Sequence, residues 1–106
     1  ISQDVIMSEQ LVGRVIYFNF RKPKDCQLWL SNNEKDGKEI EKGALQRTIL
    51  QLDETSLAIF TLFKTEADAE IVFKRFGRWT RSFLSEDDYE TVTTVGTVAY
   101  NAINDD

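Results

Sequence analysis

The segment Leu11–Arg21 reads LVGRVIYFNFR, and it decides the fold of this chain. It is rich in β-branched and aromatic residues, which favour a strand, and it ends before Pro23, which cannot donate a ladder hydrogen bond. Successive side chains of a strand point to opposite faces, and here both alternating sets are apolar. One set contains Ile16, Phe18 and Phe20, and the other contains Leu11, Val15 and Tyr17. The segment therefore predicts a strand that is buried on both faces.

A helix is predicted directly after this strand. Pro23 is suited to the first turn of a helix, and Asp36-Gly37 is a stop signal. A rival interpretation begins the helix at a capping box over residues 31–34 and ends it near Gly43. Only Ile40 would be apolar in that later helix, so we favour the earlier start. The residues that share one face of the favoured helix are Cys26, Trp29, Leu30 and Asn33.

The second half of the chain predicts a hairpin, a helix and a last strand. Two apolar runs, Leu45–Leu52 and Leu57–Phe63, are joined by four polar residues, as in a hairpin. The segment Thr65–Asp68 resembles a capping box and opens a helix. The core-facing stripe of that helix contains Ala69, Val72, Phe76, Trp79 and Phe83. The last strand is expected over Tyr89–Asn101, with Gly96 as a bulge or a close approach.

This order predicts an α+β protein with the ferredoxin-like βαββαβ arrangement and an antiparallel sheet. The length of 106 residues gives room for one domain, which we place at residues 11–103. Residues 1–10 are expected to form a loosely ordered N-terminal segment.

Apolar residues on both sheet faces predict self-association. In the third strand Phe60 and Leu62 lie opposite Leu57, Ile59 and Phe63. An exposed apolar face of this size would be a binding surface, and a second copy of the same sheet would cover it. We therefore expect a homodimer that forms a closed α+β barrel. In the alternative, loops cover this face in a monomer.

With these strands and this element order, the chain resembles the dimeric α+β-barrel superfamily, which includes antibiotic-biosynthesis monooxygenases. It is also similar to an uncharacterised ferredoxin-like protein type from marine environmental sequence. The resemblance covers the chain from Leu11 onward and lies in element order, size and two-faced strands. It implies the barrel dimer, and it implies that chemistry of the monooxygenase type needs no cofactor.

Composition excludes several classes of function. The chain has no histidine, which removes Ser-His-Asp sites, most zinc sites and a haem-ligating histidine. We predict no metal and no cofactor. The net charge of −5 argues against nucleic acid, and no apolar run is long enough to cross a membrane, so a cytoplasmic location is expected. Cys26 has no partner histidine or cysteine and is expected to be a small buried hydrophobe.

Three other βαββαβ classes were compared with the sequence. Acylphosphatase needs a glycine-bearing phosphate loop where this chain continues its strand with Ile16-Tyr17. An RNA-recognition motif needs basic and glycine positions that Leu57–Phe63 lacks. Acylphosphatase is therefore rejected, and an RNA-recognition motif is disfavoured. Amino-acid-binding regulatory domains stay open, although their glycine-containing ligand loop is not evident.

Aromatic and amide residues remain as the candidates for ligand contact. Tyr17 and Asn19 share a strand face, and Trp29 and Asn33 share a helix face. Together with Trp79 they are the predicted substrate-binding residues. The resemblance implies a pocket between helices and sheet in which such groups position an electron-rich aromatic substrate. Tyr100 belongs to the same aromatic set. Arg75 and Arg78 are candidates for the pocket mouth, although we favour a solvated face for them.

Two functions follow. In the first, the chain is a small-molecule-binding protein of the cofactor-independent monooxygenase type, acting on an aromatic substrate. In the second, it is a non-catalytic homodimeric interaction module, and the tryptophans belong to the core. The catalytic residues are not identified by the sequence.

Overall fold

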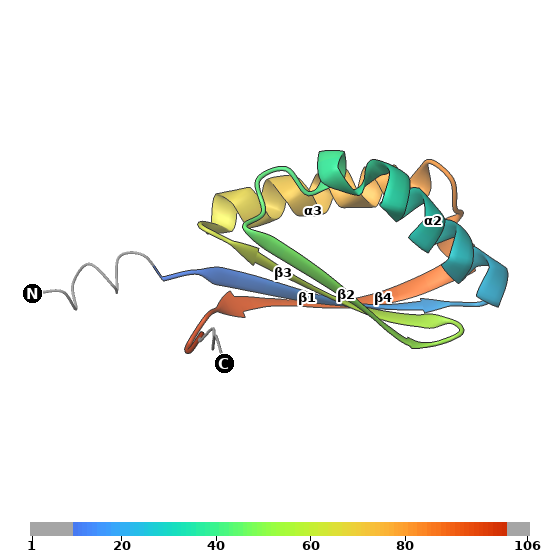
Figure 1. Cartoon of the computed structure of the whole chain (residues 1–106), viewed down its shortest axis with the longest axis horizontal. Coiled ribbons are helices and arrows are strands. Elements are labelled where there is room, and N and C mark those ends of the chain that lie inside the picture. Colours follow the sequence, from blue (N-terminus) through green and yellow to red (C-terminus); the bar gives the residue numbers. More distant parts are fainter. Residues whose placement is uncertain (1–9, 102–106) are drawn as a thin grey trace, which may run out of the picture.

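The computed structural model describes residues 10–101 and confirms the βαββαβ order (Figure 1). A single-turn 3-10 helix, η1, precedes the last strand. The elements are β1 (Val12–Phe20), α2 (Pro23–Ile40), β2 (Gln46–Asp53), β3 (Ser56–Phe63), α3 (Glu66–Arg81), η1 (Glu86–Asp88) and β4 (Tyr89–Thr97). The predicted loosely ordered segment lies outside the described residues except for Gln10, as do the last residues of the proposed domain.

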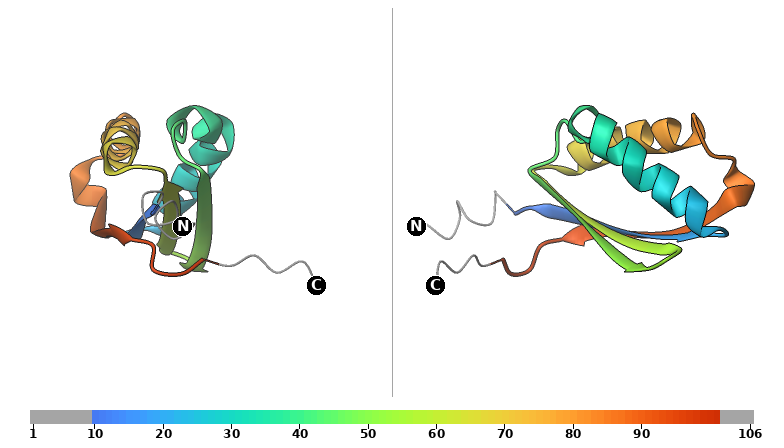
Figure 2. Two further views of the ribbon diagram at one scale, coloured as in Figure 1. Left: turned by 90° about the vertical axis from the view of Figure 1, so that its left-hand side faces the viewer. Right: turned by 45° about the vertical axis from the view of Figure 1, so that its right-hand side comes forward.

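The four strands form one antiparallel sheet in the order β2-β3-β1-β4. Both helices lie side by side on one face of this sheet, and no described element covers the other face (Figure 2). β1 is central and pairs with β3 and β4 along its whole length. The predicted ferredoxin-like fold with an antiparallel sheet is therefore correct.

Helix α2 is longer than its favoured prediction. It begins at Pro23 as expected, but it continues through Gly37 and ends at Ile40. Gly37 is buried, and a Cβ placed on it would lie 3.5 Å from Oδ1 of Asn33. The glycine with a positive φ, 103°, is Gly43 in the following turn. The early stop was wrong, because burial of Ile40 holds one more turn of helix against the core.

Local hydrogen bonds explain the hairpin and the start of α3. At the β2–β3 turn, Oδ1 of Asp53 accepts from the backbone N–H of Thr55 at 2.9 Å. The hydroxyl of Thr65 accepts from the backbone N–H of Asp68 at 3.1 Å and caps α3. The hairpin and the start of α3 were both predicted from polar residues at the ends of apolar segments.

Strand β4 corrects one prediction about glycine. Gly96 pairs with Gly13 in an unbroken register, and a Cβ on Gly96 would meet nothing within 4 Å. It is neither a bulge nor a close approach. Gly13 is the glycine that needs its small size, since a Cβ there would lie 3.2 Å from Cε1 of Phe60. The strand ends at Thr97 and not at Asn101.

The core lies between the helices and the sheet and is rich in aromatic residues. Phe18 is buried and stacks on Phe20 at 5.1 Å between ring centroids. Trp29 is fully buried against Phe18 and Phe76, at 5.5 and 5.7 Å. Burial of one such side chain stabilises the fold by about 1.5–3 kcal/mol.

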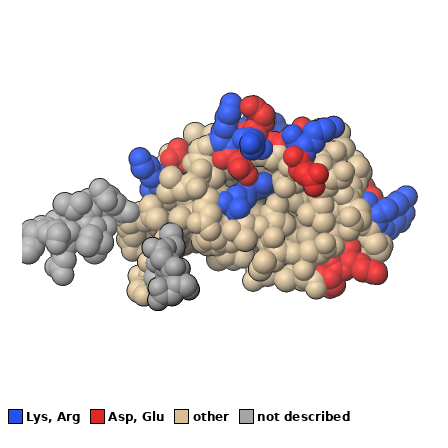
Figure 3. Space-filling view, in the orientation of Figure 1, with Lys and Arg blue, Asp and Glu red and all other residues tan. Residues whose placement is uncertain are grey.

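The other face of the sheet, which we call the outer face, is apolar but exposed. One row across the four strands joins Leu50, Ala58, Tyr17 and Val92 in register. Tyr17 is 47% exposed, and Leu50 and Val92 are 57% and 60% exposed. In Figure 3 the charged side chains gather over the helix layer and at one end of the molecule, and few lie along the sheet side. The prediction that both faces of the sheet carry apolar side chains is confirmed.

Candidate functional site

A cavity of about 370 Å³ lies between α3 and the β1–β4 side of the sheet. Its floor is apolar, and it is formed by Ile16, Phe18, Phe73 and Phe76. Ligand pockets in proteins commonly have volumes of about 300–1,000 Å³ and mostly apolar linings. We call this space the α3 cavity.

The rim of the α3 cavity is basic. It carries Lys74, Arg78 and Arg81, all exposed side chains of α3. Helical spacing places them near one another, at positions that differ by three, four and seven residues. A cationic rim around an aromatic floor favours ligands that combine an aromatic body with a negative charge.

Tyr89 brings a phenol to the same cavity. It packs on Phe18 at 5.3 Å between ring centroids. Burial raises the pKa of the Tyr89 phenol, Arg81 lowers it in part, and Glu86 raises it further. The phenol is therefore protonated at neutral pH and can donate a hydrogen bond to a ligand in the cavity.

Of the residues predicted to bind substrate, the two tryptophans have their indole N–H groups partnered within the protein. Nε1 of Trp29 donates to Oγ1 of Thr80 at 3.2 Å, and Nε1 of Trp79 donates to Oδ2 of Asp36 at 3.0 Å. The rings of Trp29 and Trp79 meet edge to face at 5.4 Å. This arrangement is that of satisfied core residues which tie α2 to α3.

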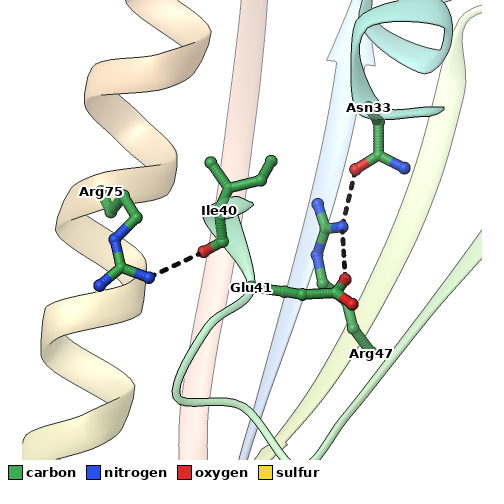
Figure 4. A network of polar contacts seen from close by, with 5 residues as sticks. All are labelled: Asn33, Ile40, Glu41, Arg47 and Arg75. Carbon is green, nitrogen blue, oxygen red and sulfur yellow. Dashed lines mark hydrogen bonds and ion pairs between the residues drawn. The ribbon is translucent and has the colours of Figure 1, made fainter. Parts of the chain in front are cut away.

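Asn33 is also partnered, and its partner is an arginine. Nη1 of Arg47 donates to Oδ1 of Asn33 at 2.7 Å and lies 3.4 Å from Oε1 of Glu41 (Figure 4). Asn33 therefore fixes the guanidinium of Arg47 beneath α2.

Tyr17 and Asn19 lie on the outer face, across the sheet from Trp29, Asn33 and Trp79. Oδ1 of Asn19 accepts from the Ser56 hydroxyl at 2.9 Å. The two-residue spacing correctly placed Tyr17 and Asn19 together, but Ile16 and Phe18 occupy the face toward the helices. The five predicted residues therefore do not line one pocket, and contact of any of them with a ligand stays a prediction.

The two predicted rim arginines have different roles. Arg78 is exposed, as on a solvated face, and it also lies at the edge of the α3 cavity. Arg75 instead donates to the backbone carbonyl of Ile40 at 3.3 Å (Figure 4). It also donates to the backbone carbonyl of Lys42 at 2.8 Å. These bonds tie α3 to the end of α2. Phe73, Lys74, Arg81 and Tyr89 were missed, although the spacing of Lys74 and Arg81 around Arg78 was a usable signal.

Cys26 is fully buried, and burial is the main cause that raises the pKa of its thiol, with Asp53 adding to it. A neutral buried thiol is a small hydrophobe, as predicted.

Within residues 10–101 no group of three or more carboxylate, thiol or imidazole side chains is arranged to hold a metal ion. Neither described helix is long and apolar enough to span a membrane.

Comparison with solved structures supports the fold. The chain is similar to a dimeric ferredoxin-like protein from an uncultured marine organism, with a TM-score of 0.68 and 14% identity over 92% of this chain and 96% of that one. SnoaB, a cofactor-independent oxygenase from Streptomyces nogalater, matches with a TM-score of 0.65 and 10% identity over 87% and 96%. A Nitrosomonas europaea protein provisionally named an antibiotic biosynthesis monooxygenase matches with a TM-score of 0.66 and 18% identity over 85% and 91%.

Another match, the NE2512 protein of unknown function from Nitrosomonas europaea, has a TM-score of 0.67 and 10% identity over 93% of this chain and 99% of that one. No protein-family model matches the sequence, and a comparison with curated proteins gives no match. Identities this low show the shared ferredoxin-like fold alone, and one fold supports many functions.

Proposed function

We propose that the α3 cavity binds a small aromatic molecule that carries an acidic or phenolic group. The observation that carries this proposal is the combination of a floor containing Phe18, Phe73 and Phe76 with a rim containing Lys74 and Arg81. The floor would stack on the aromatic body of the ligand, and the rim would attract its negative charge. Tyr89 would donate a hydrogen bond to a polar group on the ligand.

The enzymatic form of this proposal is a cofactor-independent oxygenase. A substrate with an activated CH2 group loses a proton, and the resulting anion reacts with O2. The CH2 group becomes C=O, one oxygen atom enters the substrate, and the other leaves as water, so the substrate supplies all four electrons. The basic rim would stabilise the substrate anion. The fold shared with SnoaB supports this chemistry by analogy only.

We further propose that the chain forms a homodimer through its outer face. The exposed row that contains Leu50, Tyr17 and Val92 is apolar and continuous across all four strands. A second copy would cover it with the same surface, as in an isologous dimer. The dimeric ferredoxin-like protein with the same fold supports self-association.

The alternative function is a non-catalytic homodimeric module. The observation that favours it is that the indole N–H groups of Trp29 and Trp79 and the side-chain amide oxygens of Asn19 and Asn33 are hydrogen-bonded within the chain. In that case the outer face would serve self-association, and the α3 cavity would have no ligand.

A binding experiment separates the two functions. Hydroxynaphthoates, which have no CH2 group, would be titrated against the wild-type protein to measure binding by tryptophan fluorescence. Anthrones, which have an activated CH2 group, would be titrated in air with an oxygen electrode to measure turnover as well. Thr91→Trp would fill the α3 cavity from an exposed strand position and should abolish binding, whereas Thr91→Ser should retain it. Lys74→Gln combined with Arg81→Gln should weaken binding about fivefold.

Binding with oxygen uptake would support the oxygenase, and binding without uptake would support a ligand-binding protein. If no compound binds, or if Thr91→Trp binds as well as the wild type, the α3 cavity is not a ligand site and the interaction module is favoured.

A further inference from the structure

Three polar residues form one row across the buried face of the sheet. Arg47 of β2 is in register with Thr61 of β3, and Thr61 is in register with Arg14 of β1. The side chains of Arg14 and Arg47 are both only 7% exposed, and Thr61 is buried. Strands two apart in a sheet are separated by about 10 Å, and the side chains of Arg14 and Arg47 both line one small cavity between them.

Each of these arginines is incompletely partnered. Nη1 of Arg14 donates to Oγ1 of Thr93 at 3.3 Å, Nη2 lies 3.9 Å from Oε2 of Glu70, and the guanidinium stacks 4.1 Å from the centre of the Phe73 ring. Within the described residues, Nε of Arg14 and Nη2 of Arg47 are buried and have no hydrogen-bond partner. A buried donor left without a partner costs about 1–3 kcal/mol, and more when it is charged.

The carboxylates that lie near the row are more exposed than the arginines. The side chain of Glu41 beside Arg47 is 40% exposed, and that of Glu70 beside Arg14 is 62% exposed. Burial lowers the pKa of the Arg47 guanidinium, and Glu41 acts in the opposite direction. Arginine nevertheless stays protonated in proteins, so the row holds two positive charges that water-screened carboxylates neutralise only in part.

A second cavity lies directly against this row. It has a volume of about 20 Å³ and is lined by Arg14, Thr61 and Arg47, with Ile16, Ile59 and Phe76 among its apolar walls. A cavity needs about 10–15 Å³, counted in the same way, to hold one water molecule. The space therefore suits a single compact group and excludes an aromatic ring.

We propose that this second cavity binds one monovalent anion of about the size of chloride, held between the guanidinium groups of Arg14 and Arg47 with the Thr61 hydroxyl as a further donor. The anion accepts from the unpartnered N–H groups and compensates the buried positive charge, which a water molecule would not do. Gluconate and sulfate are too large for the cavity. This second cavity shares the walls Ile16, Phe73 and Phe76 with the α3 cavity. Its polar lining of Arg14, Thr61 and Arg47 is its own, so the anion site does not depend on the proposed small-molecule ligand.

Thermal unfolding in a halide-free buffer tests the anion site. Sodium bromide, compared with sodium gluconate at equal ionic strength, should raise the Tm of the wild-type protein to a plateau, as expected for one saturable site in the folded state. Arg47→Lys keeps the charge but loses the planar fork, and it should weaken the apparent affinity for bromide about tenfold. Arg21→Lys makes the same change at an exposed arginine and should leave the bromide response unchanged.

A second variant and a direct observation keep the proposal testable if Arg47→Lys folds poorly. Thr61→Val preserves the shape of the side chain, removes the hydroxyl, and should also reduce the response. Crystals grown in bromide should give an anomalous peak between Arg14 and Arg47. A Tm that rises equally in all variants, or bromide peaks confined to the molecular surface, would overturn the proposal.

Discussion

The two faces of the sheet differ in exposure, and the difference is the reverse of what the polarity of their side chains would predict. On the outer face, the row that contains Leu50, Tyr17 and Val92 is apolar and about half exposed. On the inner face, the row that contains Arg47 and Arg14 is charged and buried. Coverage by the helices decides burial here, and polarity does not.

Each mismatch between polarity and burial favours a partner from outside the single chain. An exposed apolar face favours a second protein surface, because water is a poor solvent for it. A buried pair of like charges favours a counter-ion, because the low-dielectric interior does not solvate charge. The two partners that we propose, a second copy on the outer face and an anion on the inner face, follow from these two mismatches.

The largest expected effect comes from Phe18→Ala on the inner face. Phe18 is 2% exposed and contacts Phe20, Trp29 and Phe76, so its truncation leaves a cavity in the core. The free energy of unfolding should fall by about 3–5 kcal/mol, measured by urea denaturation. Tyr17→Ala, one residue away on the outer face, is the matched control when both are measured at concentrations where the chain is monomeric. Equal losses in the two variants would contradict the assignment of faces.

The next largest effect is expected from Tyr17→Glu on self-association. A charge at the centre of an apolar row would be buried without a partner in the dimer. The dissociation constant of the dimer should rise at least 30-fold, as measured by sedimentation velocity. Lys38→Glu, on the exposed side of α2, is the control and should change the constant little. An unchanged dimer in Tyr17→Glu would exclude the outer face as its interface.

A smaller effect is expected from Asn33→Ala beneath α2. The change removes the 2.7 Å acceptor of Arg47 Nη1 and leaves Oε1 of Glu41, at 3.4 Å, as the remaining partner of this buried nitrogen. The free energy of unfolding should fall by about 1–3 kcal/mol, and Ser31→Ala on the exposed side of the helix should change it by less than about 0.5 kcal/mol. If Asn33→Ala is as stable as the wild type, Asn33 does not position Arg47.

The smallest effect is expected from Asp53→Asn at the exposed β2–β3 turn. Hydrogen bonds, first from the backbone N–H of Thr55 and then from Ser56, lower the pKa of the Asp53 carboxyl below its ordinary value of 3.8. The unfolded chain therefore binds this proton more readily, and the carboxylate stabilises the fold above pH 3.8. The stability difference between wild type and Asp53→Asn should shrink as pH falls below that value. A difference that grows on acidification would contradict this assignment.

The fold was largely predictable because local signals agreed with the tertiary structure. Alternation in β1, the hairpin and the Thr65 cap each confirmed an expected element. The end of α2 was not predictable from Gly37, because Ile40 gains burial only once the helix lies on the sheet. Packing therefore overrode a local stop signal.

The candidate site was less predictable, since two apolar faces leave open which one the helices cover. The choice depends on packing across the whole domain, and it moved Tyr17 and Asn19 away from the tryptophans. Arg14 could have been recognised, because it has the same parity as Ile16 and Phe18 and must share their buried face. Its row with Thr61 and Arg47 required the strand register, which the sequence does not contain.

Sedimentation equilibrium of the wild-type chain at about 10 micromolar tests most directly whether the outer face is covered by a second copy. The chain mass is 12.2 kDa. We expect a species of twice that mass, which converts to a single chain in Tyr17→Glu. A wild-type protein that sediments as a single chain of 12.2 kDa at this concentration would contradict the account.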